Sequence, residues 1–153
     1  MTPVLDSPLG SEVVAIRGPE PDSWTANLEA GYFVGNVRNE WIGARRIRLL
    51  DDFAFVENLG DGKWHRWEAL AGDVCDGSSI PWLLQRWAGS PFVGLHRFPS
   101  VPHDRACVER TMPSWRVHRM YLKGCLAAGQ PYAKVYGRAV ILSGPKFSGE
   151  RER

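Results

Sequence analysis

Residues 53–67 read FAFVENLGDGKWHRW, two aromatic-rich runs separated by a turn. Phe53–Val56 and Trp64–Trp67 have the aromatic and β-branched content of short strands, and Asn58–Gly62 supplies the glycine and aspartate of a hairpin turn. Two similar runs precede this hairpin, Tyr32–Val34 and Ile47–Leu50. From Tyr32 to about Leu70 the sequence therefore predicts an antiparallel β-meander with one buried face.

The composition of the chain changes at Gly72. Residues 72–102 are punctuated by proline and glycine and predict a loop-rich segment with one short helix, Trp82–Ala88. Three helical segments are expected after it: His103 to about Arg110, Trp115 to about Ala128, and Pro131 to about Leu142. In the second of these, four apolar residues fall at helical spacing and share a face: Val117, Met120, Tyr121 and Cys125. The predicted fold class is α+β, a β-meander followed by a loop-rich segment and a bundle of about three helices.

Length and composition predict one domain. The 153 residues are 44% hydrophobic and 24% charged, which is typical of a folded globular chain. Residues 1–30, rich in proline, glycine, serine and acidic side chains, predict an irregular N-terminal arm. The domain is expected to span residues 31–147, with a polar tail at 148–153.

Several function classes are disfavoured by the same data. The formal net charge is only +2 and the arginines are scattered, so no nucleic-acid surface is predicted. No apolar run approaches the roughly 18 residues of a transmembrane helix. Met1–Gly10 lacks the pattern of a secretory signal, which favours a cytoplasmic location. The three cysteines have no CxxC spacing and are expected to be reduced thiols.

The dipeptide His103-Asp104 is the first candidate for chemistry. Neighbours on a helix point about 100° apart, so the imidazole can face a substrate while the carboxylate faces a metal ion. Histidine exchanges protons near neutral pH, and a carboxylate suits a hard cation such as calcium. Because the connection to the next helix is short, that helix is expected to run back antiparallel to the first and to bring His118 close to His103. Taken alone, the dipeptide favours the structural interpretation, in which Asp104 complements the helix N-terminus.

The loop Asp76–Pro81 is the second candidate. It can offer a carboxylate from Asp76 and a backbone carbonyl from Gly77 to a cation, with Ser78 and Ser79 beside them. Asp-Gly is also common turn chemistry, and Ser79 can simply cap a short helix. Cys107, one turn after His103, could form a nucleophile pair with it, although a buried thiol on a helix is more often part of the core.

Taken in their order along the chain, several sequence motifs, which include the two candidates above, resemble a phage and prophage family catalogued as domain of unknown function 1353. The segments that carry the resemblance are AGDVCDGSSIP at 71–81, GSPF at 89–92, HDRAC at 103–107, Tyr136–Val140, and GPKF at 144–147. They extend over about Tyr32 to Phe147. The resemblance implies a phage or prophage context, with a host or phage protein as a possible partner and a virion-associated location as an alternative. It implies no established activity.

A more distant similarity, to microbial secreted phospholipase A2, implies a mechanism. In that family a histidine on one of two antiparallel helices activates the water that attacks an ester, and calcium is bound by the adjacent aspartate and a loop. By position, His103 is similar to the base, and Asp104, Asp76 and Gly77 are similar to the calcium ligands. His118 falls where that family has an orienting aspartate, and Tyr121 where its aromatic residue follows.

The histidine at 118 leaves three functions open. The first is a calcium-dependent hydrolase of an ester, phospholipids included. The second is a non-catalytic phage structural, assembly or host-inhibitory protein, because a neutral imidazole lacks the charge that stabilises an imidazolium. The third is a zinc-dependent hydrolase with His103, His118 and Asp104 as ligands.

Overall fold

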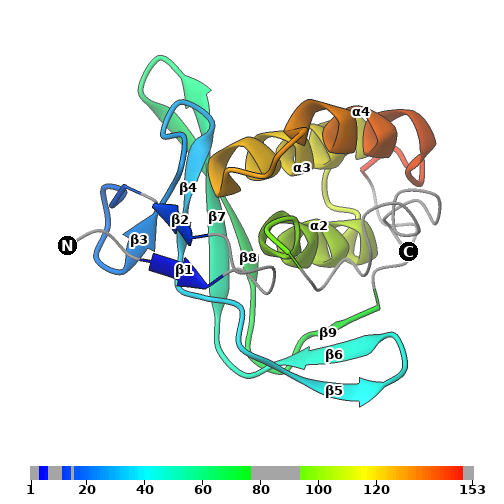
Figure 1. The fold of residues 1–153 in the computed structure, drawn as a ribbon. Helices are drawn as coiled ribbons and strands as arrows, with labels where there is room; N and C mark the ends of the chain where they lie inside the picture. Colours follow the sequence, from blue (N-terminus) through cyan, green and yellow to red (C-terminus); the bar gives the residue numbers. More distant parts are fainter. Residues whose placement is uncertain (1–3, 7–11, 15, 77–93, 150–153) are drawn as a thin grey trace.

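The computed structural model describes residues 4–6, 12–14, 16–76 and 94–149. Antiparallel β-sheets form the N-terminal half, and three helices follow in the C-terminal half of the described chain (Figure 1). The predicted α+β class is therefore confirmed. The expected helix at Trp82–Ala88 lies outside the described residues.

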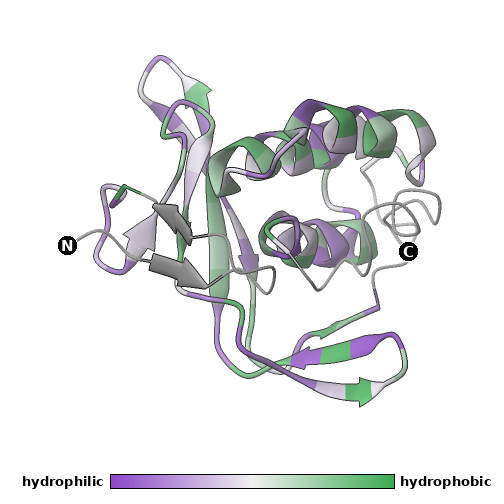
Figure 2. Cartoon of the chain, in the orientation of Figure 1, coloured by the Kyte–Doolittle hydropathy of each residue, from purple (hydrophilic) through white to green (hydrophobic). Residues whose placement is uncertain are grey.

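The largest sheet is antiparallel and contains four strands. Its order is β3 (Ser23–Trp24), β4 (Gly31–Val34), β7 (Phe53–Gly60) and β8 (Lys63–Ala69). The β7–β8 pair is the predicted hairpin, with Phe55 opposite Trp67. Its turn at Asp61 and Gly62 has positive φ at both residues, which suits the Asp-Gly sequence. Figure 2 shows hydrophobic residues along β7, which lies inside the sheet.

Two smaller sheets complete the β-structure. The first contains β5 (Asn39–Gly43), β6 (Arg46–Leu49) and β9 (Val74–Cys75), in that order. In β6, Ile47 and Leu49 are buried and the two arginines are exposed, the alternation expected of a half-buried strand. The second pairs β1 (Val4–Asp6) with β2 (Glu12–Val14).

Helices α2 (Arg97–Glu109), α3 (Ser114–Ala128) and α4 (Ala133–Ser143) follow the sheets. Helices α2 and α3 contact β7 of the large sheet, and α4 packs on α3 (Figure 1). Between the two layers, aromatic rings of the sheet stack on one another and contact the ring of Phe98 in α2 edge-on or tilted: Trp24, Phe33 and Phe53. The predicted apolar face of α3 is confirmed, since all four of its residues are fully buried. None of the described helices combines the length and apolarity needed to cross a membrane.

Helix α2 begins six residues earlier than expected. The sequence predicted a start at His103, whereas Arg97 is the first helical residue. Pro99 lies in the first turn, where backbone N–H groups have no partner in the helix, so its missing donor has no cost. Pro102 lies inside the helix and removes one hydrogen bond. The neighbouring side chains of Phe98 and Val101 are fully buried, and their packing offsets this loss.

A buried carboxylate fastens α3 to the large sheet. Glu57 of β7 has no solvent exposure and accepts a hydrogen bond from Trp67 Nε1 at 3.1 Å. Arg116 Nη1 lies 3.0 Å from both carboxylate oxygens, and Lys123 Nζ lies 3.5 Å from one of them. Both cations come from α3, so this ion-pair network fixes the position of the helix that carries His118.

Candidate functional site

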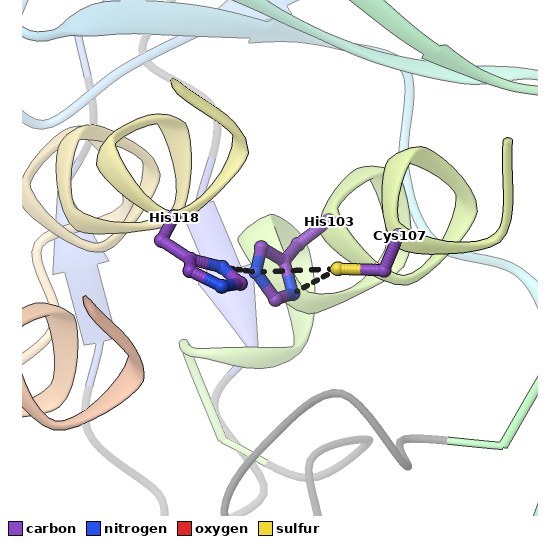
Figure 3. Close-up of side chains that lie close together, drawn as sticks. All are labelled: His103, Cys107 and His118. Atoms are coloured by element: carbon purple, nitrogen blue, oxygen red, sulfur yellow. Dashed lines mark hydrogen bonds between the residues drawn. The ribbon is translucent and has the colours of Figure 1, made fainter. Parts of the chain in front are cut away.

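The site lies between α2 and α3, which run antiparallel. Gly124 allows their close approach, because a Cβ atom at this position would lie 2.5 Å from Pro99 Cβ. The helices are joined by a short turn, in which Arg110 ends α2 in the left-handed conformation. As a result His103 of α2 and His118 of α3 face each other (Figure 3).

The two imidazoles belong to one chain of hydrogen bonds. His103 Nε2 lies 2.9 Å from His118 Nδ1, and His118 Nε2 lies 2.7 Å from the carbonyl oxygen of Pro145. A carbonyl only accepts, so the proton of a neutral His118 is on Nε2. Its Nδ1 then accepts, and the proton of His103 is on Nε2. This arrangement leaves the lone pair of His103 on Nδ1.

Cys107 extends this pair to a group of three. It lies one helical turn after His103, with its Sγ 3.7 Å from His103 Nε2 and 3.9 Å from Nδ1 (Figure 3). One ligand atom from each of His103, Cys107 and His118 lies within 4.8 Å of the other two, and all three residues are buried. Thiolate and imidazole are good ligands for several transition metals, so the group can hold a metal ion.

Burial keeps both imidazoles neutral at ordinary pH. It lowers the pKa of His103 to about 3, with a smaller contribution from His118. Burial also lowers the pKa of His118, against the opposing effect of its hydrogen bond to Pro145. The ring of Tyr121 lies 5.1 Å from that of His103, and burial raises the pKa of its hydroxyl. Each histidine therefore retains one nitrogen lone pair, which can accept a proton or bind a metal.

The two aspartates predicted to bind calcium, Asp76 and Asp104, both act on the thiol of Cys75. Asp104 is buried and interacts with the thiol of Cys75 through a hydrogen bond. The pKa of this thiol is raised, first by burial and then by the charges of Asp104, Asp73 and Asp76. One thiol is thus within electrostatic range of both Asp76 and Asp104. Gly77, Ser78 and Ser79 lie outside the described residues.

The sequence anticipated part of this geometry. The expected approach of His118 to His103 is confirmed by their 2.9 Å contact, and Tyr121 does lie against His103. Their assignment as orienting residue and base stays a prediction. Cys107 was expected to be a core residue, and it is buried, but it also lies against His103. Its spacing of four residues from His103 is the pattern that could have indicated a shared ligand set.

Comparison with known proteins yields one partial similarity. No family model matches the chain, and no solved structure matches it. The protein described as "Uncharacterized protein y4iH" of Sinorhizobium fredii (strain NBRC 101917 / NGR234) is 35% identical over 102 residues. The aligned region covers 65% of this chain and 41% of the relative, so the chain spans less than half the length of the relative it matches. The chain is therefore similar to one region of a longer bacterial protein whose description states no activity.

Proposed function

We propose that this chain is a phage- or prophage-type protein with a hydrolase-like site for esters, phospholipids included, in which His103 is the general base. One observation carries the proposal. The hydrogen bonds that His103 Nε2–H donates to His118 Nδ1, and His118 Nε2–H to the Pro145 carbonyl, leave the lone pair of His103 on Nδ1. A general base needs an oriented, neutral imidazole, and the lowered pKa of His103, about 3, makes this one a weak base near neutral pH.

In the proposed reaction, Nδ1 of His103 takes a proton from the water that attacks the ester carbonyl. As the imidazolium forms, its Nε2–H donates more strongly to Nδ1 of His118. His118 is a neutral acceptor, so it stabilises this cation less than a carboxylate would. We therefore expect slow hydrolysis.

In this proposal a divalent cation is bound by the aspartates near the histidine pair. Asp76 and Asp104, which both act on the Cys75 thiol, would hold calcium together with the backbone carbonyl of Gly77. Bound there, calcium would stabilise the negative charge that develops on the ester oxygen. Zinc held by His103, His118 and Asp104 is the alternative for a zinc-dependent hydrolase.

A second candidate function is non-catalytic. His103 has no solvent exposure, which favours a phage structural, assembly or host-inhibitory protein built on the same scaffold. In this alternative the histidine pair joins α2 to α3 and never meets a substrate.

Two measurements test the proposal. Calcium is titrated calorimetrically into EDTA-stripped protein and into Asp104→Asn, in which binding should vanish. Hydrolysis of ester and phospholipid substrates is then compared for the wild type, His103→Asn and His118→Asp. The His118→Asp variant should be faster by at least about tenfold, because a carboxylate stabilises the imidazolium, and His103→Asn should be inactive. If neither the wild type nor His118→Asp hydrolyses any substrate, the hydrolase proposal fails and the non-catalytic function is favoured.

A further inference from the structure

We propose that His103, Cys107 and His118 form a binding site for a transition metal of the zinc class, with His103 Nε2, His118 Nδ1 and Cys107 Sγ as ligands. This site uses Cys107 in place of the Asp104 suggested by the sequence. It is also separate from the calcium site at Asp76 and Asp104. The inference does not rest on the hydrolase proposal, and it describes a different state of His103, because metal on Nε2 leaves Nδ1 protonated and so removes the lone pair of the proposed base.

The three ligand atoms lie within 4.8 Å of one another, and two of their separations are close to those around a tetrahedral ion. With Zn–N of about 2.05 Å and Zn–S of about 2.3 Å, tetrahedral angles place two nitrogens about 3.4 Å apart and a nitrogen and a sulfur about 3.6 Å apart. The observed separations are 2.9 Å between the two imidazole nitrogens and 3.7 Å from Cys107 Sγ to His103 Nε2. Sγ is nearly as close to Nδ1, at 3.9 Å, as to Nε2, so it lies to the side of the Nε2 lone pair. Binding therefore needs an opening of about half an ångström between the rings and a rotation of the Cys107 side chain or the His103 ring that brings Sγ toward the ion.

The surroundings of His118 are those of a metal-binding histidine. Such residues usually donate their second ring N–H to a carboxylate or a backbone carbonyl, which fixes the tautomer. His118 Nε2 is 2.7 Å from the carbonyl oxygen of Pro145, so its Nδ1 lone pair is directed at His103 before any metal arrives. Gly144 permits this contact, because a Cβ atom there would lie 2.9 Å from ring atoms of His118.

The proton balance of binding is simple. The thiol of Cys107 loses its proton to solvent and becomes a thiolate. The proton of His103 is removed from Nε2 and one is taken up on Nδ1, so the imidazole stays neutral. One proton is therefore released for each metal ion bound, and the metal replaces the hydrogen bond between the two rings.

The ligand set determines the class of metal. One thiolate and two imidazoles favour zinc and its cobalt substitute over calcium or magnesium, which prefer oxygen ligands. The three protein ligands leave one tetrahedral position for an additional ligand. Because the residues are fully or almost fully buried, water competes poorly for the ligand atoms.

Cobalt provides a direct test in the reduced, EDTA-stripped protein. One equivalent of Co²⁺ should give the visible absorption of a tetrahedral site and a thiolate-to-cobalt charge-transfer band in the near ultraviolet. Zn²⁺ should abolish both, and about one proton should be released into weakly buffered solution for each metal bound. If the wild type gives no charge-transfer band, the proposal is wrong.

Variants identify the ligands. Cys107→Ser should lose the charge-transfer band and bind cobalt at least about a hundredfold more weakly, since even outer partners of a metal site contribute 10–100-fold. Cys125→Ser is the matched control, because Cys125 is a buried helical thiol outside the group. Asp104→Asn should retain the band, and His118→Asn should lose tetrahedral absorption. A band that persists in Cys107→Ser, or that Asp104→Asn abolishes, would overturn this ligand set. Circular dichroism of each metal-free variant checks that it is folded.

Discussion

Two neutral imidazoles buried between α2 and α3 make stability depend on pH in a defined direction. In the unfolded chain a histidine has a pKa of about 6.5. In the folded, metal-free protein, burial and the neighbouring His118 lower the pKa of His103 to about 3. Below pH 6.5 the unfolded state therefore binds more protons than the folded state. The contribution to stability is complete above this pH and is progressively lost as pH falls toward 3.

The size of the effect follows from these two pKa values. Between pH 7 and pH 5, His103 alone should reduce the free energy of unfolding by about 2 kcal/mol. The figure hardly changes if the folded-state pKa is one unit higher, because either value lies well below pH 5. His118, whose pKa is also lowered by burial, adds to the loss in the same direction.

Urea unfolding at the two pH values, with EDTA present, measures this loss. The comparison is between the wild type and His103→Gln, which cannot titrate at this position. The variant should be less stable at pH 7, yet its loss of stability between pH 7 and pH 5 should be smaller than that of the wild type by about 2 kcal/mol. Equal losses in the two proteins would refute the conclusion that His103 is buried in the neutral form.

Two further changes test the contacts around the site. Gly144→Ala places a methyl group 2.5 Å from the Val140 carbonyl oxygen and 2.9 Å from ring atoms of His118, and should destabilise the protein by about 1–3 kcal/mol in thermal or urea unfolding. Gly43→Ala is its control, with the nearest atom at 3.9 Å and an expected effect within about 0.5 kcal/mol; similar losses in both variants would contradict the steric argument. Glu57→Ala removes the buried partner of the partly buried Arg116 and Lys123 and should cost about 3–5 kcal/mol. Glu40→Ala removes an exposed ion pair and should cost less than about 1 kcal/mol, so equal costs would show that burial of the Glu57 pair is unimportant.

Local sequence was sufficient for much of the fold. The β7–β8 hairpin followed from an Asp-Gly turn between aromatic runs, and the buried face of α3 followed from helical spacing. The first two turns of α2 were missed because Pro99 and Pro102 indicate a break when only local preference is considered. Burial of Phe98 against the sheet decides that segment, and it depends on residues far away in the chain.

The candidate site, like the fold, was predictable where it depends on local sequence and not where it depends on tertiary packing. The meeting of His103 and His118 required only two antiparallel helices with a short connection. The position of Cys107 beside them depends on the rotation of α2 about its axis, and this rotation is set by tertiary packing. The contact from His118 to the Pro145 carbonyl depends on the backbone path after α4, for which the sequence contains no periodic pattern.

The three residues of the site are close together in the sequence, and this has a consequence for the order of folding. His103 and His118 are only 15 residues apart, and Cys107 lies between them, so one helical hairpin contains the whole group. In contrast, the hydrogen bond from Thr25 to the Ala127 carbonyl joins residues 102 positions apart. Local contacts form faster than distant ones, so we expect the histidine pair to assemble before α3 docks on the sheet. A metal present during synthesis would then meet its ligands on a nascent hairpin, and would be enclosed when Pro145 and Phe147 pack against His118.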